Sequence, residues 1–241
     1  MREAFGADRR RVAIMQPYLF PALPYLQLVH AADLFVLYDD AHFSHRRWTH
    51  RNRVQVNGAH HLFTVPLAER SQAKALCDIA LHPTQFARWR DKFMRTMRLS
   101  YARAPFAGDI WDELEALLAG PHASLAELAS ASVRWLSDLF RIPAEYAVSS
   151  TIEFDRSLDA QAKILAMANG LGATHYVNMP GGWKLYDRPA FDAATIDLGF
   201  IENRLTAVDG IDLSALHLAL LHPPERRAQF AAAYSIDGGA D

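Results

Sequence analysis

Several polar side chains follow apolar segments at the points where those segments end. Gln16 comes directly after the apolar run VAIM, and Asn178 closes the run HYVN. Asp39 and Asp40 end a third run, DLFVLY. A side-chain amide can orient a ligand, and a carboxylate can act as a general base or bind a metal. The alternatives are that Gln16 caps backbone groups exposed by neighbouring prolines, and that the aspartates are an ordinary acidic strand end.

The segment RRWTHRNR, residues 46–53, concentrates positive charge and aromatic rings. An arginine side chain has a planar fork of donors that matches phosphate or carboxylate. A solvated basic loop is the alternative interpretation. Since long loops in compact domains are often functional, an anion-binding role is favoured. The segment contains Arg46, Arg47, Arg51 and Arg53, with Asn52 among them.

Two glycines, Gly181 and Gly182, stand between an expected strand and an expected helix in NMPGGWKLYD. Backbone N–H groups at such a turn can approach an anionic group closely. Any tight turn uses glycine, however, so the pair alone is a weak signal. Tyr186 and Asp187 follow at the start of the helix, where an acidic side chain also suits the helix N-terminus without any ligand.

The other reactive side chains match no known type of centre. None of the 11 histidines has the spacing of zinc ligands, so no metal is predicted. The single cysteine, Cys77, lies in ALCDIAL, which is typical of a core strand in which a thiol is inert. The chain has no G-x-S-x-G, Walker or G-x-G-x-x-G motif. The sequence therefore identifies no cofactor.

Composition narrows the class of protein. The chain has 241 residues, and its hydrophobic fraction of 51% and charged fraction of 22% are typical of a globular domain. Its formal net charge of −2 gives no bulk attraction to a nucleic-acid duplex or an anionic membrane. One cysteine suits a reducing compartment, and no secretory signal or membrane span is evident. We expect a cytoplasmic protein without a membrane partner, either monomeric or a homodimer.

The expected elements place the polar side chains on a sheet. Strand, helix and strand follow one another within residues 11–40, which is a βαβ unit and predicts a parallel sheet. Strands and helices alternate again near the C-terminus, and a helical block of about residues 83–141 lies between. The prediction is one α/β domain, residues 1–241, with a mostly parallel sheet and this block as an insertion. Ligands bind beyond the carboxyl ends of parallel strands, so the polar side chains should converge at one edge.

The rest of the chain gives more local expectations. Residues 41–58 are expected to be a loop, residues 77–81 a short strand, and residues 235–241 loose. Pro17 should end the first strand because it offers no N–H to a neighbour. The result would be a rigid loop that presents Gln16 and Tyr18 over the sheet edge, near Asp40 and the glycine pair.

Taken in order, these motifs resemble those of the WbqC-like family, over most of the chain. This chain departs from the usual family pattern at Pro24, where glycine is common, and at His217, where an acidic residue is usual. The matching stretches are IMQPYLFP, YLQLV, ADLFVLYDD, RNRV, LFTVPL, SSTIEFD, LGATHYVNMPGGWKLYD and IDLGFIEN.

The resemblance implies a transferase. Genes of the family resemble components of O-antigen, other surface-polysaccharide and natural-product loci, which implies transfer of an activated acyl or aminoacyl group, such as glycyl, onto an amine. The donor would be linked to a carrier protein, a tRNA or a nucleotide, and the acceptor would be a small amine or an amino sugar.

The same resemblance implies roles for particular residues. Asp40 would be the base for the attacking amine, and Gln16 and Asn178 would orient the carbonyl group. Arg51 and Arg53 would hold a phosphate of the donor. Tyr18 and Asp39, which neighbour Gln16 and Asp40 in sequence, are expected to bind the substrate, as are Asn52, Gly181, Gly182, Tyr186 and Asp187. The family motifs carry over onto Gln16, Pro17, Asp40, Arg51, Asn52, Arg53, Asn178, Gly181, Gly182, Tyr186 and Asp187.

Two alternatives stay open. The passage from strand through Gln16 and Pro17 into a helix is similar to the Rossmann-like, nucleotidyltransferase-like fold. There a histidine pair before the first helix holds phosphates, and that pair is absent here. This likeness implies a fold more than a reaction, and it leaves nucleotidyl transfer or ATP-dependent ligation open. The other alternative is a non-catalytic scaffold subunit of a biosynthetic complex.

Overall fold

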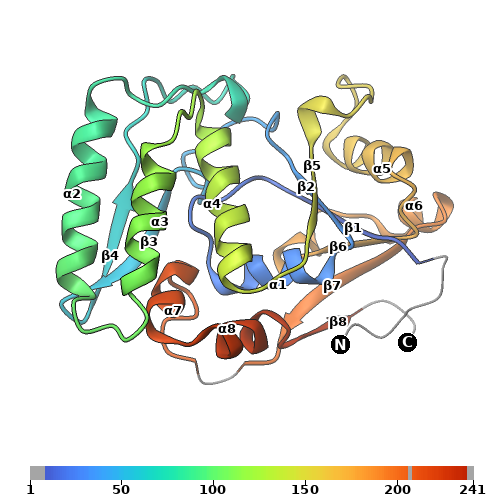
Figure 1. Cartoon of the computed structure of the whole chain (residues 1–241). Helices are drawn as coiled ribbons and strands as arrows, with labels where there is room; N and C mark the ends of the chain where they lie inside the picture. The colour runs from blue at the N-terminus through green and yellow to red at the C-terminus, as the bar shows by residue number, and fades with distance from the viewer. Residues whose placement is uncertain (1–8, 206–207, 238–241) are drawn as a thin grey trace.

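The computed structural model describes residues 9–205 and 208–237 (Figure 1). Within them, the strands are β1 (Arg11–Met15), β2 (Leu34–Leu37), β3 (Arg51–Val56), β4 (Ala59–Thr64), β5 (Glu145–Val148), β6 (His175–Asn178), β7 (Asp197–Asn203) and β8 (Tyr234–Asp237). The helices are α1 (Leu23–Ala31), α2 (Gln85–Ser100), α3 (Gly108–Ala119), α4 (Leu125–Leu139), α5 (Ala160–Gly170), α6 (Arg188–Ala193), α7 (Ala215–Leu221) and α8 (Pro224–Ala231). Three short 3-10 turns are η1 (Leu76–Asp78), η2 (Ser149–Thr151) and η3 (Pro180–Gly182).

The main sheet of the described residues has the strand order β5-β2-β1-β6-β7-β8. Its first five strands are parallel, and β8 is antiparallel to its neighbour β7. Helix α1 connects β1 to β2, α5 connects β5 to β6, and α6 connects β6 to β7. The expected α/β fold with a mostly parallel sheet is therefore confirmed.

Both faces of this sheet are covered by helices. Val12 and Ile14 of β1 pack in a cluster that includes Ile164 and Phe191, so α5 and α6 cover that face. Ala13, between them in sequence, points to the other face and the larger cluster formed with α1, α4 and α8. Figure 1 shows α5 and α6 on the side of the sheet opposite α2, α3 and α4. Burial on both faces explains why β1 and β2 are continuous apolar runs.

The helical block forms where the sequence predicts it, as α2, α3 and α4. At the start of α4, the Ser124 hydroxyl accepts a hydrogen bond from the backbone N–H of Glu127 (3.2 Å), as expected for a capping box. The Glu127 carboxylate in turn accepts from the backbone N–H of Ala123 (2.8 Å). None of the helices in the described ranges is long and apolar enough to cross a membrane.

The expectation that residues 41–58 form a loop is wrong for its second half. Strand β3 pairs there with β4 as an antiparallel hairpin that packs against α2. Asn57 and Gly58 make the turn, with φ values of +51° and +78°. An Asn-Gly pair between two strands is a strong hairpin signal, and it was present in the sequence.

Two further expectations about strands are wrong. Residues 77–81 form no regular strand, because the 3-10 turn η1 is followed only by isolated bridges. The C-terminal segment is not loose up to Asp237, because β8 hydrogen-bonds along β7 and so finds partners for its backbone. Residues 238–241 lie outside the described residues.

Candidate functional site

A crevice opens where the strand order of the sheet reverses. From β1 the chain proceeds to β2 and β5 on one side, and β6 and β7 lie on the other side. Since α1 and α6, the helices that follow β1 and β6, pack on opposite faces, the loops that leave these two strands diverge at their carboxyl ends. A cavity of about 560 Å³ lies there. The sequence-predicted residues that line it are Gln16, Tyr18, Asn178, Gly181, Gly182 and Tyr186.

The loop after β1 is fixed by hydrogen bonds from distant parts of the chain. The backbone N–H of Phe20 donates to the Ser132 hydroxyl of α4 (2.9 Å). The Asn52 amide donates to the carbonyl oxygens of Leu19 and Phe20, at 3.2 and 2.7 Å. These bonds hold Phe20 at a φ of +44°, a conformation that few non-glycine residues adopt. Buried Asn52 therefore supports the loop and does not line the cavity.

Gln16 and Tyr18 bring polar groups from this loop to the cavity wall. The backbone carbonyl of Gln16 accepts from the Tyr25 hydroxyl (3.0 Å), whereas its side-chain Nε2 makes only a long contact of 3.4 Å with the carbonyl of His42. The Gln16 amide thus keeps the capacity to bind a ligand. Burial raises the pKa of Tyr18, and the nearby charge of Arg47 opposes this rise, so Tyr18 is a neutral hydroxyl beside a guanidinium group.

Asn178 is the centre of a buried hydrogen-bond network. Its Nδ2 donates to the hydroxyl oxygens of Tyr176 and Tyr186, both at 2.9 Å, and its Oδ1 accepts from the backbone N–H of Met179 (2.7 Å). Both amide hydrogens are therefore used inside the protein. This differs from the role expected from the sequence, because Asn178 positions Tyr186 and has no donor left for a ligand.

The network leaves the proton of the Tyr186 hydroxyl available. The hydroxyl oxygens of Tyr176 and Tyr186 are 3.0 Å apart, whereas the Ile14 carbonyl lies 3.4 Å from the Tyr176 hydroxyl. The shorter distance favours Tyr176 as the donor to Tyr186. Tyr186 then accepts two hydrogen bonds and can direct its own proton into the cavity. Burial raises the pKa of Tyr186, and the accepted bonds oppose that rise, so the hydroxyl stays protonated at neutral pH.

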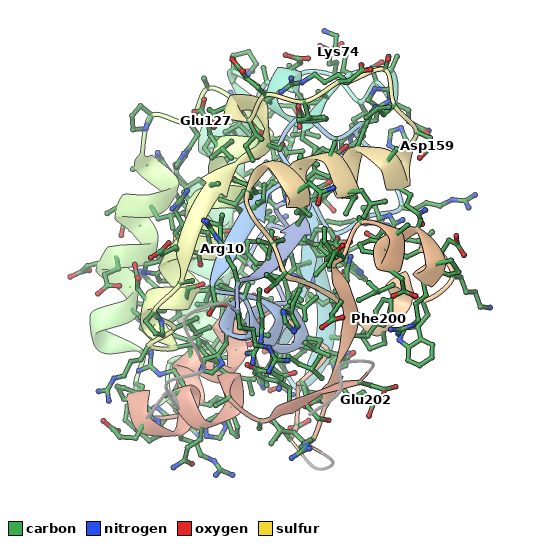
Figure 2. The ribbon with its side chains drawn as sticks, turned by 90° about the vertical axis from the view of Figure 1, so that its right-hand side faces the viewer. Arg10, Lys74, Glu127, Asp159, Phe200 and Glu202 are labelled. Carbon is green, nitrogen blue, oxygen red and sulfur yellow. The ribbon has the colours of Figure 1, made fainter. Side chains whose placement is uncertain are left out.

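The two glycines of η3 have different surroundings. A Cβ atom on Gly182 would lie 3.2 Å from the ring of Tyr186 and 3.3 Å from that of Phe200, whereas one on Gly181 would meet nothing within 4 Å. Figure 2 shows Phe200 on β7 and Asp159 at the start of α5. Strand β7 contacts this turn, and Ala160, Gln161 and Ile164 of α5 line the same cavity as the two glycines. Gly182 permits the close packing that holds the Tyr186 ring.

This contrast predicts the behaviour of a matched pair of variants. We expect Gly182→Ala to lower the free energy of unfolding by about 1–3 kcal/mol, because the added methyl group overpacks the Tyr186 ring. Gly181→Ala should change it by less than about 0.5 kcal/mol. Urea denaturation of both variants measures the difference. Equal losses in the two would show that the turn does not support Tyr186 in this way.

The positive charge at the cavity comes from Arg46 and Arg47. Both are exposed, line the cavity together with Trp48, and form no ion pair with a carboxylate of the described ranges. Among the described residues, no Asp or Glu lines the cavity. The crevice is therefore electropositive in a chain whose net charge is −2.

Arg51 and Arg53, which were expected to hold a phosphate, do not line the cavity. Arg53 forms an ion pair with Asp212 (3.0 Å). The guanidinium groups of Arg51 and Arg53 lie 5.7 and 5.3 Å from the centre of the Trp48 ring. Residues 51 and 53 share one face of β3, and their guanidinium groups pack over Trp48 outside the cavity lining.

Asp39 and Asp40 hold the turn η2 and do not line the cavity. Buried Asp39 accepts from the Ser149 hydroxyl (2.9 Å) and from the N–H and hydroxyl of Ser150 (2.9 and 2.7 Å). Asp40 accepts from the Ser149 hydroxyl and from Nε of Arg156, the latter at 3.0 Å. Both carboxylates thus have partners within the protein. Within residues 9–205 and 208–237, no group of three or more His, Cys, Asp or Glu side chains is placed to hold a metal ion.

The Asp40 ion pair gives a second prediction. We expect Asp40→Asn and Arg156→Met each to lower the free energy of unfolding by about 1–2 kcal/mol, because each breaks the same charge-assisted hydrogen bond. Since both substitutions remove the same interaction, the double variant should lose less free energy of unfolding than the sum of the two single losses. Urea denaturation of the three variants tests this. If Asp40 were the base, Asp40→Asn would instead lower turnover at least about tenfold at unchanged stability.

One further residue expected in the site lies outside the cavity, and several residues that line the cavity were not predicted from the sequence. Asp187 is the N-cap residue before α6 and does not line the cavity, and its backbone N–H donates to Oε1 of Gln161 (2.6 Å). Gln161 lines the cavity, as do Tyr38 and Leu185, and none of these was predicted. Tyr38 could have been found from its place at the end of β2. The pattern around Gln161 indicated only a helix.

Comparisons with other proteins agree with the extent of these motifs. The sequence pattern of the WbqC-like protein family matches residues 16–207, from the loop after β1 to beyond β7. An uncharacterized protein of Mycobacterium tuberculosis, Rv1507c, is 25% identical over 190 residues, which are 78% of this chain and 80% of that protein. No solved structure shows significant similarity to the chain.

Proposed function

The chain belongs to the WbqC-like protein family, and from this premise we propose that it transfers an activated acyl or aminoacyl group, such as glycyl, onto an amine. The observation that carries the proposal is the electropositive cavity, without carboxylates, at the carboxyl ends of β1 and β6. Donors linked to a carrier protein, a tRNA or a nucleotide all carry phosphate, which is bonded to the activated carbonyl group in an acyl nucleotide and lies farther along the carrier in the other two. Two arginines without carboxylate partners suit such a phosphate.

The proposed donor would lie across the cavity. Its phosphate would be bound by Arg46 and Arg47, and its carbonyl group would face Gln16 and Tyr186. A volume of about 560 Å³ is sufficient for the reactive end of the donor and a small amine. The products would be amides on surface polysaccharides or natural products, and the proposal assigns the activity to the cytoplasm, where such donors are made.

In the proposed reaction, the lone pair of the amine forms a C–N bond to the donor carbonyl, whose oxygen becomes negatively charged. The Gln16 amide and the Tyr186 hydroxyl donate hydrogen bonds to this oxygen, which lowers the barrier. The tetrahedral intermediate then expels the thiolate, alkoxide or phosphate of the donor. No histidine or carboxylate of the described residues lines the cavity. The proton of the amine therefore leaves with the expelled group or to water.

The test is a direct assay of amide formation. The purified protein is given S-glycyl phosphopantetheine, glycyl-tRNA or glycyl adenylate as donor, with glucosamine as acceptor, and the product is identified by mass spectrometry. We expect an enzyme-dependent glycyl amide from at least one donor. If none of the three yields an amide above the uncatalysed rate, the proposal fails for the glycyl group.

One observation favours a second candidate, nucleotidyl transfer or ATP-dependent ligation on a Rossmann-like, nucleotidyltransferase-like fold. The cavity lies where the strand order reverses, which is where doubly wound sheets bind nucleotides. The rings of Tyr18 and Trp48 at its wall could stack on a base. This candidate predicts that millimolar ATP with Mg²⁺ raises the melting temperature, because a ligand that binds only the folded state stabilises it. An unchanged melting temperature would exclude it.

A further inference from the structure

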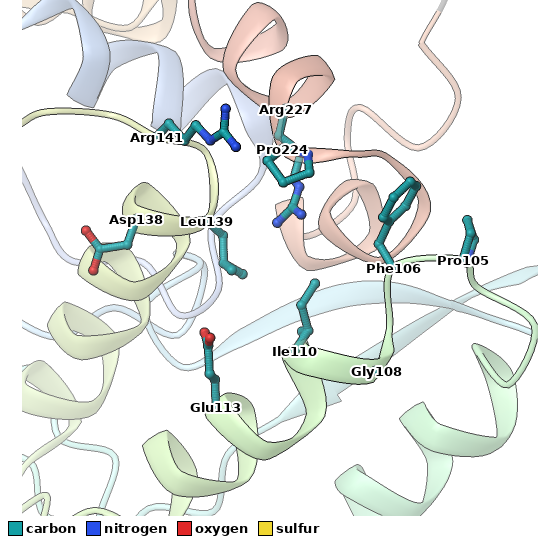
Figure 3. A pocket seen from close by; sticks show the side chains of 10 residues that line it. All are labelled: Pro105, Phe106, Gly108, Ile110, Glu113, Asp138, Leu139, Arg141, Pro224 and Arg227. Carbon is teal, nitrogen blue, oxygen red and sulfur yellow. The ribbon is translucent and has the colours of Figure 1, made fainter.

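A second cavity, of about 520 Å³, lies where α3 begins, α4 ends and α8 passes beside them (Figure 3). No residue lines both this cavity and the crevice. Its apolar surface comes from Phe106, Ile110 and Leu139. Two arginines and two carboxylic residues complete it, so it combines an apolar surface with charged groups.

Arg227 of α8 is a buried cation in the wall of this cavity. It is only 5% exposed, and its Nε atom is buried without a hydrogen-bond partner. Figure 3 shows its guanidinium group directed into the cavity, toward Ile110 and Leu139. Burial and the nearby charge of Arg141 lower the pKa of Arg227. The charges of Glu225 and Glu113 oppose this fall, but no carboxylate of the described residues forms an ion pair with Arg227. Because a buried charge without an ion-pair partner is costly, an anion beside it would stabilise this arrangement.

Arg141 supplies a second guanidinium group at the same end of the cavity. It follows α4 with a φ of +54°, a conformation that is costly for a residue other than glycine. Its backbone N–H donates to the Asp138 carbonyl (2.9 Å), and its side chain pairs with the exposed Glu225 (3.0 Å). Figure 3 shows the Arg141 guanidinium group turned toward Arg227. The charge of Glu225 acts on both guanidinium groups but forms an ion pair only with that of Arg141, so a further anion between the two would meet the unpaired charge of Arg227.

The opposite wall limits what kind of anion fits. Glu113 points into the cavity, and its carboxylate accepts a hydrogen bond from the Trp135 ring nitrogen (2.8 Å). Asp138 is nearby, and burial together with the charge of Glu113 raises its pKa. A ligand with negative charge at both ends would meet repulsion there. The apolar surface between favours a hydrocarbon chain.

We propose that this cavity binds a small organic molecule with one anionic group. The anionic group lies between Arg141 and Arg227, and the apolar part lies on Phe106, Ile110 and Leu139. A carboxylate and a phosphate monoester share the chemistry that these arginines recognise. Because this cavity shares no residue with the crevice, the inference stands apart from the proposed transferase function.

The experiment measures the melting temperature of the full chain with three probes. Hexanoate and butyl phosphate are the two kinds of anion, and hexylamine has a comparable chain with the opposite charge. We expect one or both anions to raise the melting temperature by about 3–6 °C at twenty times the dissociation constant, and hexylamine to have no effect. A shift with hexanoate indicates a carboxylate ligand, and a shift with butyl phosphate indicates a phosphate ligand. No shift with either anion, or an equal shift with hexylamine, would overturn the proposal.

Variants of Arg227 then test whether the anion that raises the melting temperature binds in this cavity. Arg227→Met keeps the apolar stem but removes the buried charge, so it should abolish the anion-dependent shift while the ligand-free melting temperature stays equal or rises. Arg226→Gln changes an exposed neighbour on the same helix and should keep the shift. If Arg227→Met does not fold, Arg141→Gln should weaken binding about tenfold by titration calorimetry. An anion-dependent shift that survives both the Arg227 and the Arg141 changes would overturn the assignment.

Discussion

Replacement of Tyr186 by Phe should lower kcat for amide formation about a hundredfold, with little change in KM. The reason lies in the network under the crevice, in which Asn178 donates to the Tyr186 hydroxyl. The distance of 3.0 Å favours Tyr176 as a second donor, which directs the Tyr186 proton outward. That proton would stabilise negative charge that exists only on the tetrahedral intermediate, so its loss should affect the rate more than binding. Stability should fall by only about 1 kcal/mol, because one hydrogen bond is lost.

Tyr38 offers the matched control for this measurement. It also lines the cavity, and its backbone N–H donates to the Met15 carbonyl, but no side chain of the described residues donates to its hydroxyl. Tyr38→Phe should therefore change kcat by less than about threefold. Steady-state kinetics on both variants test the contrast. A Tyr186→Phe enzyme with nearly normal kcat, or equal losses in the two variants, would remove Tyr186 from the reaction.

The double variant Arg46→Gln, Arg47→Gln should lower kcat/KM about a hundredfold, mainly through KM. Each guanidinium group is expected to form a charge-assisted hydrogen bond to the donor phosphate, and about 1.5 kcal/mol for each bond gives this ratio. Both arginines are exposed, so the value is at the lower end for such bonds. The wild-type KM should also rise with salt, since screening weakens the attraction of exposed charges.

The double variant Arg51→Gln, Arg53→Gln is the control. It removes the same formal charge from the same segment, but these two side chains lie over Trp48 outside the cavity lining. Its kcat/KM should fall by less than about fivefold, through the weaker long-range field alone. The reverse order of effects, with Arg51 and Arg53 dominant, would restore the assignment that the sequence motif suggested.

The sequence sufficed to predict the mostly parallel sheet and the edge at which Gln16 and Asn178 line one cavity. Apolar runs and helical periodicity identify βαβ units, and the carboxyl ends of parallel strands bring Gln16 and Asn178 together without further information. The prolines after Gln16 also predicted that the loop after β1 is rigid. What they did not show is that Asn52 and Ser132, distant in sequence, hold that loop by hydrogen bonds.

The roles of individual polar residues could not be predicted because they depend on partners distant in sequence. The sequence around Asp40 indicates no partner for its carboxylate. The fold places Arg156 and Ser149, more than a hundred residues away in sequence, beside it. Arg46 and Arg51 are equivalent by type and position in the basic segment, but in the fold Arg46 lines the cavity and Arg51 packs over Trp48 outside it. Buried Arg227 had no local signal, since its isolation is a property of the packing of α3, α4 and α8.

Hydrogen–deuterium exchange with the three glycyl donors, each added in turn, tests the central claim most directly. If the crevice is the donor site, the donor that binds should slow backbone exchange in residues 14–22 and 176–187, which border the cavity. Residues 105–113 and 224–230, around the second cavity, should exchange as before. Protection confined to the second cavity, or to the hairpin of β3 and β4, would contradict the assignment of the crevice as the transferase site.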